Sequence, residues 1–238
     1  MPQLLQIQQT SLSLSYHSTL QKHTVMEKKL IAYHGDPKIK EFYLARVRAH
    51  RLADQIIQGT GWDEASQRGC AVGCTLHSYN HSAYEKELGL HRILARLQDG
   101  IFESLPIEEA QEFPLKFLSA IEPGADLSGV WLKFEIWMLI DETHGVLHFA
   151  KSERSRKAIE LVADAYRRGL ASPLSVEEWG GIRSAAAAAA AADAAAYAAA
   201  AAYADADADA NAKKIDWRRA QAKKLLELLA SAPIYTEK

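Results

Sequence analysis

The chain has 238 residues with 28 Lys and Arg against 30 Asp and Glu, so its formal net charge is −2. This near balance argues against a dedicated nucleic-acid binder, which normally presents a basic face, and we expect no nucleic-acid partner. No run of about 18 bulky apolar residues is present, so we expect no membrane span.

Composition divides the chain into three segments. Residues 1–26 are polar and poorly patterned, which predicts a poorly ordered N-terminal extension, with Met26 as an alternative start. They lack the features of a signal peptide, so we expect a cytoplasmic protein. Residues 27–172 predict a helical globular domain, and residues 173–238 an alanine-rich helical C-terminal segment.

The globular segment consists of successive helical patterns, so the expected fold class is all-α, an irregular multi-helix domain. Asp36 is placed to cap a helix that Pro37 opens and Gly59 stops, which predicts a helix over about 37–58. The stretch 127–147 is too densely apolar for one stripe, which predicts a central, buried helix. Other helices are predicted over 91–102, 106–121 and 155–168.

The C-terminal segment begins with Ser175 and Glu178, whose spacing is that of a helix capping box. Residues 185–212 are mostly alanine, the strongest helix former, and an amphipathic stretch follows from Ile215. This pattern predicts a long helix. Its small alanine faces would let it pack closely on a neighbour, or mediate self-association with a second copy.

The chemically dense stretch is 69–87, which holds both cysteines and two histidines. Cys70, Cys74, His77 and His81 are spaced by four, three and four residues, and thiolate and imidazole are the usual zinc ligands. On one straight helix this row would span about 16 Å, too far to converge on one ion. We therefore assign no metal ligands and do not favour zinc unless the chain turns near Gly73.

Two further interpretations of these four residues remain open. Either cysteine could act as a nucleophile, with His77 or His81 as its base, because a thiolate needs a base or a positive charge nearby. This gives the candidate catalytic set Cys70, Cys74, His77 and His81. Alternatively, both cysteines are small core residues beside a tight glycine turn, since free cysteine is among the most buried residue types.

A second candidate set concerns ligand binding. His34 and Asp36 precede a predicted helix, where an anion is bound well, although Asp36 can equally serve only as the cap. Tyr84 and Glu85 belong to the dense stretch and complete this set.

Three stretches together resemble a group of uncharacterised bacterial and phage proteins with a GCAVGC motif and an alanine-rich C-terminus. They are residues 33–40, residues 69–76 and the alanine–aspartate tail after Trp179. The resemblance supports the domain limits and implies no activity. The sequence thus favours a helical binding or interaction module, and its alternative is a small enzyme or metalloprotein centred on residues 70–81.

Overall fold

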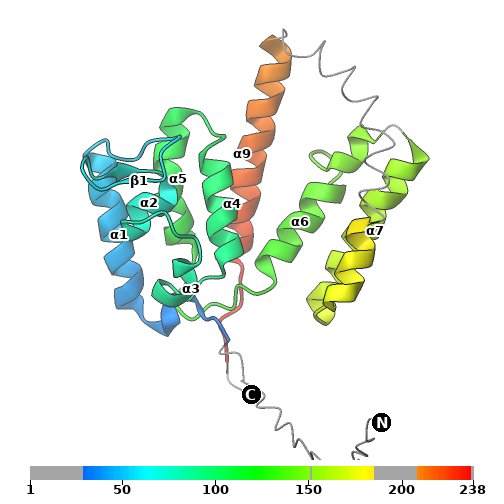
Figure 1. Cartoon of the computed structure of the whole chain (residues 1–238), viewed down its shortest axis with the longest axis horizontal. Helices are drawn as coiled ribbons and strands as arrows, with labels where there is room; N and C mark the ends of the chain where they lie inside the picture. The colour runs from blue at the N-terminus through cyan, green and yellow to red at the C-terminus, as the bar shows by residue number, and fades with distance from the viewer. Residues whose placement is uncertain (1–28, 151, 185–207, 237–238) are drawn as a thin grey trace, which may run out of the picture.

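The computed structural model describes residues 29–150, 152–184 and 208–236, and this part of the chain is mostly helical (Figure 1). The expected all-α class is confirmed. Within the same residues, no helix combines the length and the apolar character that crossing a membrane requires. The predicted N-terminal extension and most of the alanine tract lie outside the described residues.

The first part of the fold is a body in which the short helix α2 packs against three longer ones, α1, α4 and α5. Its elements are η1 (Ala32–Gly35), α1 (Pro37–Leu52), β1 (Trp62–Asp63), β2 (Arg68–Gly69), α2 (Ala71–Leu76), α3 (Ala83–Glu87), α4 (Arg92–Phe102) and α5 (Ile107–Ala120). β1 and β2 form a small antiparallel hairpin in which Trp62 pairs with Gly69. The largest fully buried side chains of this body include Tyr84, Phe102 and Phe117.

The remaining elements lie on the other side of α9 (Ala208–Ala230) from α1 (Figure 1). They are α6 (Val130–Ile140), η2 (Val146–Phe149) and α7 (Glu153–Ala171), followed by helical residues 176–184. α6 packs against both α7 and α9, and α9 packs against α5. The helix α9 therefore joins the body to the α6–α7 pair.

Helix α1 begins as predicted but ends earlier. The Asp36 carboxylate accepts a hydrogen bond from the Lys38 N–H, so Asp36 is the expected cap. The predicted end at Gly59 is wrong, because the helix stops at Leu52. The chain then turns through Asp54, whose φ is 51°, and the backbone of Ile56 bridges to Gly69. Backbone pairing thus takes this β-branched residue out of the helix.

The central, buried helix predicted over 127–147 is also wrong in length and in burial. α6 ends at Ile140 because the Asp141 carboxylate accepts hydrogen bonds from the N–H groups of Thr143 and His144 in a local turn. Only three of its residues are buried, namely Val130, Leu132 and Phe134. Every residue from 135 to 140 is half-buried, so α6 presents apolar side chains at the surface of the described structure.

The C-terminal segment contains the predicted capping box. The Glu178 N–H donates to the Ser175 hydroxyl, and the Ser175 N–H donates to the Glu178 carboxylate. Further along, α9 buries Leu225 and Leu229 in the core of the chain. One face of α9 is therefore occupied within the molecule. Self-association through this helix, and the boundary at residue 173, remain predictions.

A close approach fixes α2 against the segment before β1. A Cβ at Gly73 would overlap with the carbonyl oxygen of Gly61, and one at Gly69 would lie 2.5 Å from the same atom. The Cys70 N–H also donates to the Thr60 carbonyl at 2.7 Å. Two glycines of the GCAVGC motif are thus needed so that the backbone of 60–62 can lie against α2.

We predict opposite effects for two glycine substitutions in helices. Gly73→Ala should lower the free energy of unfolding by at least about 2 kcal/mol, because the added methyl group meets backbone that cannot rotate away. Gly100→Ala is the matched control, since no atom lies within 4 Å of a Cβ placed there. It should stabilise α4 by about 0.5–1 kcal/mol.

Urea unfolding followed by circular dichroism measures both changes. Equal, small effects of the two substitutions would contradict the proposed packing of α2 on the Gly61 backbone.

Candidate functional site

The four Cys and His residues predicted as one site lie in three different places in the structure, two polar groups and the core position of Cys74. Cys70 and His81 lie near Asp99 of α4, whereas His77 bonds to His50 of α1. The chain does turn after α2, because His77 ends this helix in the left-handed conformation with φ 54°. The turn separates the four side chains instead of gathering them round one ion.

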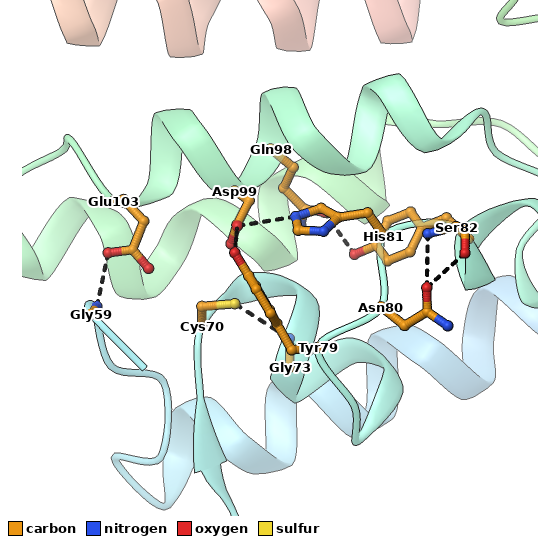
Figure 2. A network of polar contacts seen from close by, with 11 residues as sticks. Gly59, Cys70, Gly73, Tyr79, Asn80, His81, Ser82, Gln98, Asp99 and Glu103 are labelled. Atoms are coloured by element: carbon orange, nitrogen blue, oxygen red, sulfur yellow. Dashed lines mark hydrogen bonds and ion pairs between the residues drawn. The ribbon is translucent and has the colours of Figure 1, made fainter. Parts of the chain in front are cut away.

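The first group is centred on the buried carboxylate of Asp99, and we call Cys70, Tyr79, His81, Asp99 and Glu103 the Asp99 cluster (Figure 2). Asp99 is only 7% exposed. Its Oδ2 accepts hydrogen bonds from the Tyr79 hydroxyl at 2.9 Å and from the His81 Nε2 at 3.1 Å. Its Oδ1 is also buried and has no hydrogen-bond partner.

Cys70 approaches this carboxylate from the start of α2. It is the N-cap residue, and its sulfur accepts a long hydrogen bond of 3.5 Å from the Gly73 N–H. Burial is the largest cause that raises the pKa of the Cys70 thiol to about 12, and the interaction of the protonated thiol with the Asp99 carboxylate adds to the shift. The thiol is therefore protonated near neutral pH, which makes it a poor nucleophile in this state.

Glu103 lies one helical turn beyond Asp99 and forms the exposed edge of the cluster. Its Oε2 accepts a hydrogen bond from the Gly59 N–H at 2.8 Å. Partial burial, together with Asp99, raises the pKa of Glu103, and the hydrogen bond from Gly59 opposes that shift. Two carboxylates and a thiol thus lie close together, and only Glu103 of the three is exposed.

The second group is a pair of histidines bridging α1 and the end of α2. His50 Nε2 lies 2.8 Å from His77 Nε2, and His50 Nδ1 lies 2.6 Å from Gln55 Oε1. Since an amide oxygen accepts, His50 carries its proton on Nδ1, and His77 donates from Nε2. The ring of Trp62 stacks on His77 at a centroid distance of 4.9 Å.

Electrostatics make His77 prefer the neutral form. Burial is the main cause that lowers the pKa of His77, and Arg46 and His50 add to the shift. Protonating both Nε2 atoms would also remove the acceptor from the hydrogen bond that joins the two rings. The pair therefore links α1 to α2 best when it is uncharged.

Cys74 lies in the core away from both imidazoles. Its thiol contacts the backbone carbonyls of Gly69 and Gln55 at 3.3 and 3.5 Å. Burial raises its pKa to about 12. In the described part of the chain no hydrogen bond joins either sulfur to a histidine, so the geometry lends no support to a thiol–imidazole pair.

The four candidate ligand-binding residues have structural partners. His34 Nε2 lies 2.8 Å from the Lys86 carbonyl, and Asp36 caps α1. Glu85 forms a two-pronged ion pair with Arg92, which lowers the pKa of Glu85. Tyr84 is fully buried, and its hydroxyl donates to Gln98 Oε1 at 2.7 Å beside the Asp99 cluster. Among the described residues, each of the four has a different hydrogen-bond partner.

Sequence reasoning missed Asp99 and Gln98. Both occupy core positions of the amphipathic helix α4, on the same face as Leu94 and Ala95. A polar side chain at a core position is a recognisable sign of a functional or strained site. The polar residues at core positions of α4 are visible in the sequence, whereas the proximity of Cys70 to Asp99 depends on the tertiary fold.

A separate cavity of about 500 Å³ lies between α6, α7 and the helical residues 176–184. Three aromatic side chains form much of its wall, and one cation is at its edge. Its lining residues are Trp131, Val162, Tyr166, Val176, Trp179, Ile182 and Arg183. The cavity is remote in sequence from every residue selected as a site candidate.

We predict that both thiols of the native protein react slowly with a disulfide reagent. Cys70 and Cys74 are 1% and 0% exposed, and the reactive thiolate is scarce when the pKa is about 12. Stopped-flow labelling with and without denaturant measures this, and unfolded protein should release two equivalents rapidly. Fast labelling of a single cysteine in the folded protein would instead support a nucleophile.

We also predict that stability falls as the pH drops below about 6.5, the ordinary His pKa. A histidine whose pKa is lowered by folding binds a proton more readily in the unfolded chain, so acid favours unfolding. Urea unfolding midpoints are measured at test pH values between about 7.5 and 5. Over this range the midpoint should fall less in His77→Asn than in the wild type. An identical pH profile in both proteins would contradict the proposed role of His77.

Comparison of the chain with protein-family models, with curated proteins and with solved structures gives no match. The resemblance to the proteins with a GCAVGC motif therefore remains a prediction. Function has to be inferred from the geometry of the Asp99 cluster and of the aromatic cavity.

Proposed function

We propose that this helical protein is a binding module whose ligand occupies the cavity between α6, α7 and residues 176–184. The observation that carries the proposal is the cavity itself, whose volume of about 500 Å³ lies within the range of small-molecule sites. Such sites are mostly apolar and have a few polar groups that fix orientation. This cavity has that composition.

The aromatic wall favours a ligand with a flat apolar part. Tyr166 lies between two tryptophans, with ring centroids 5.7 Å from Trp131 and 5.3 Å from Trp179. The rings are inclined to one another by 82° and 49°, so they present both edges and faces to the cavity. Aromatic ligands gain both from burial and from edge-to-face contacts with such rings.

Charge at the rim favours an anionic substituent on that ligand. Arg183 is the one charged residue of the lining, and it forms no hydrogen bond or ion pair with the described residues. A guanidinium binds carboxylate, sulfonate and phosphate groups through paired N–H donors. The proposed ligand class is therefore a compact aromatic or apolar anion.

The test uses anilinonaphthalene sulfonate, a fluorescent aromatic anion, titrated into the full-length protein. We expect one saturable site per chain, accompanied by quenching of tryptophan fluorescence. Trp179→Ala should weaken binding by about tenfold through lost ring contact. Arg183→Gln should weaken it by about threefold or more, because it removes only the charge at the rim.

Leu161→Ala is the matched control, since Leu161 is a 40% exposed apolar residue of α7 that does not line the cavity. The Leu161→Ala variant should bind anilinonaphthalene sulfonate with the wild-type affinity. Circular dichroism and urea midpoints establish that the variants are folded. Binding that is absent, unsaturable, or unchanged by both lining substitutions in folded protein would overturn the proposal.

A further inference from the structure

We propose that the Asp99 cluster is a site for a divalent transition metal ion of the Zn²⁺ type. The ligands would be the Cys70 sulfur, the free Asp99 Oδ1 and a Glu103 carboxylate oxygen. One ligand atom from each of these three residues lies within 4.8 Å of the other two. The site is separate from the aromatic cavity, and the inference does not rest on the proposed ligand binding.

The buried oxygen Oδ1 of Asp99 is the first argument. It accepts no hydrogen bond of ordinary geometry, and the protonated Cys70 thiol that interacts with this carboxylate is only a weak donor. A poorly satisfied acceptor in the interior is costly and therefore rare in native proteins. The other oxygen is satisfied twice, by Tyr79 and by His81. A cation bound to Oδ1 would complete the coordination of this carboxylate.

The hydrogen bonds to Oδ2 have the form of an outer shell around a metal ligand. Carboxylates that bind metals are themselves held by hydrogen bonds, which fix their orientation. Tyr79 and His81 fix Asp99 in this way, and both side chains come from the loop that follows α2 (Figure 2). This assigns a positioning role to His81 instead of a place in a Cys–His row.

Metal binding requires the three ligand atoms to move slightly closer together, and the site can make this movement. Around a tetrahedral ion with bonds of about 2.0–2.3 Å, neighbouring ligand atoms are about 3.6 Å apart. The observed limit of 4.8 Å must therefore shrink by about 1 Å. Glu103 is exposed and, among the described residues, its side chain is held only through the hydrogen bond from the Gly59 N–H to Oε2, so rotation of this side chain can supply that movement while Cys70 and Asp99 stay in the interior.

The ligand set selects the class of metal. A thiolate favours Zn²⁺ and similar ions over Mg²⁺ and Ca²⁺, which prefer all-oxygen sites. Three protein ligands leave a fourth position for water, the arrangement of catalytic zinc sites. On binding, the Cys70 S–H bond breaks, a sulfur–metal bond forms, and the proton passes to solvent. The electron pair stays on sulfur, so no oxidant or reductant is needed.

The test titrates the metal-free, full-length protein with Co²⁺, which serves as a spectroscopic substitute for Zn²⁺. Thiolate coordination should produce a near-ultraviolet charge-transfer band that saturates at one ion per chain. The same titration in weakly buffered solution should release about one proton per ion, because the free thiol has a pKa of about 12. Addition of Zn²⁺ should displace Co²⁺ and abolish the band.

Paired variants locate the site. Cys70→Ser should abolish the band, whereas Cys74→Ser should retain it because Cys74 contacts only backbone carbonyls. Glu103→Gln should weaken Co²⁺ binding by at least about tenfold while keeping the band at saturation. Asp63→Asn, which alters an exposed carboxylate outside the cluster, should bind Co²⁺ as the wild type does.

His81→Ala tests the positioning role, since loss of an outer-shell partner weakens metal binding by about 10–100-fold without changing the ligand atoms. The proposal is overturned if folded wild-type protein gives no charge-transfer band, or if the band survives in Cys70→Ser. If Cys70→Ser does not fold, Glu103→Gln decides, because the Gln side chain can still accept the hydrogen bond from the Gly59 N–H. Unchanged affinity in that variant also overturns the site.

Discussion

The close approach between α2 and the Gly61 backbone is the constraint on which the rest of this structure depends. Gly73 has no Cβ at the point of contact, so the first turn of α2 lies directly on the segment that leads into β1. That contact sets how deeply α2 enters the body. It thereby sets the position of Cys70 at one end of α2 and of His77 at the other.

The position of α2 creates two polar groups that have different physical roles. At the start of α2, Cys70 comes within reach of the Asp99 carboxylate, where a buried acceptor lacks a partner. At its end, His77 meets His50 in a satisfied hydrogen bond and stacks on Trp62. A satisfied pair stabilises the fold, whereas an unsatisfied buried oxygen costs free energy unless something binds it. Only the first group therefore points to a ligand.

Much of the fold could be predicted because its signals are local. Asp36 caps α1, and Ser175 with Glu178 forms the capping box, as hydrogen-bonding side chains at helix starts predict. Helix ends were less predictable. Ile56 fits a helical stripe and an extended segment equally well, and its backbone pairing with Gly69 depends on a residue that lies 13 positions away.

The candidate site, like the fold, could be predicted only where its signals are local in the sequence. Residue types indicated that the stretch 69–87 carries the chemistry, and Cys70 and His81 do lie at the Asp99 cluster. Which side chains meet there could not be read from spacing. A left-handed residue at His77 turns the chain, and the decisive carboxylates come from a helix that begins after this stretch. Convergence of side chains from different elements is a property of the tertiary fold.

The aromatic cavity has its own physical origin in the composition of α6 and α7. α6 is apolar on nearly every side, but the fully buried residues of α7 are Ala163 and Ala165, whose side chains fill little volume. The capping box starts the next helix, and in that helix Trp179 contacts Tyr166 of α7. These two rings form one wall of the cavity but do not fill it. Apolar surface on a helix is normally buried against a partner of matching size. The two alanines do not line the cavity, whereas Trp131 of α6 and Val162 and Tyr166 of α7 do. A ligand in the cavity would cover this accessible apolar surface.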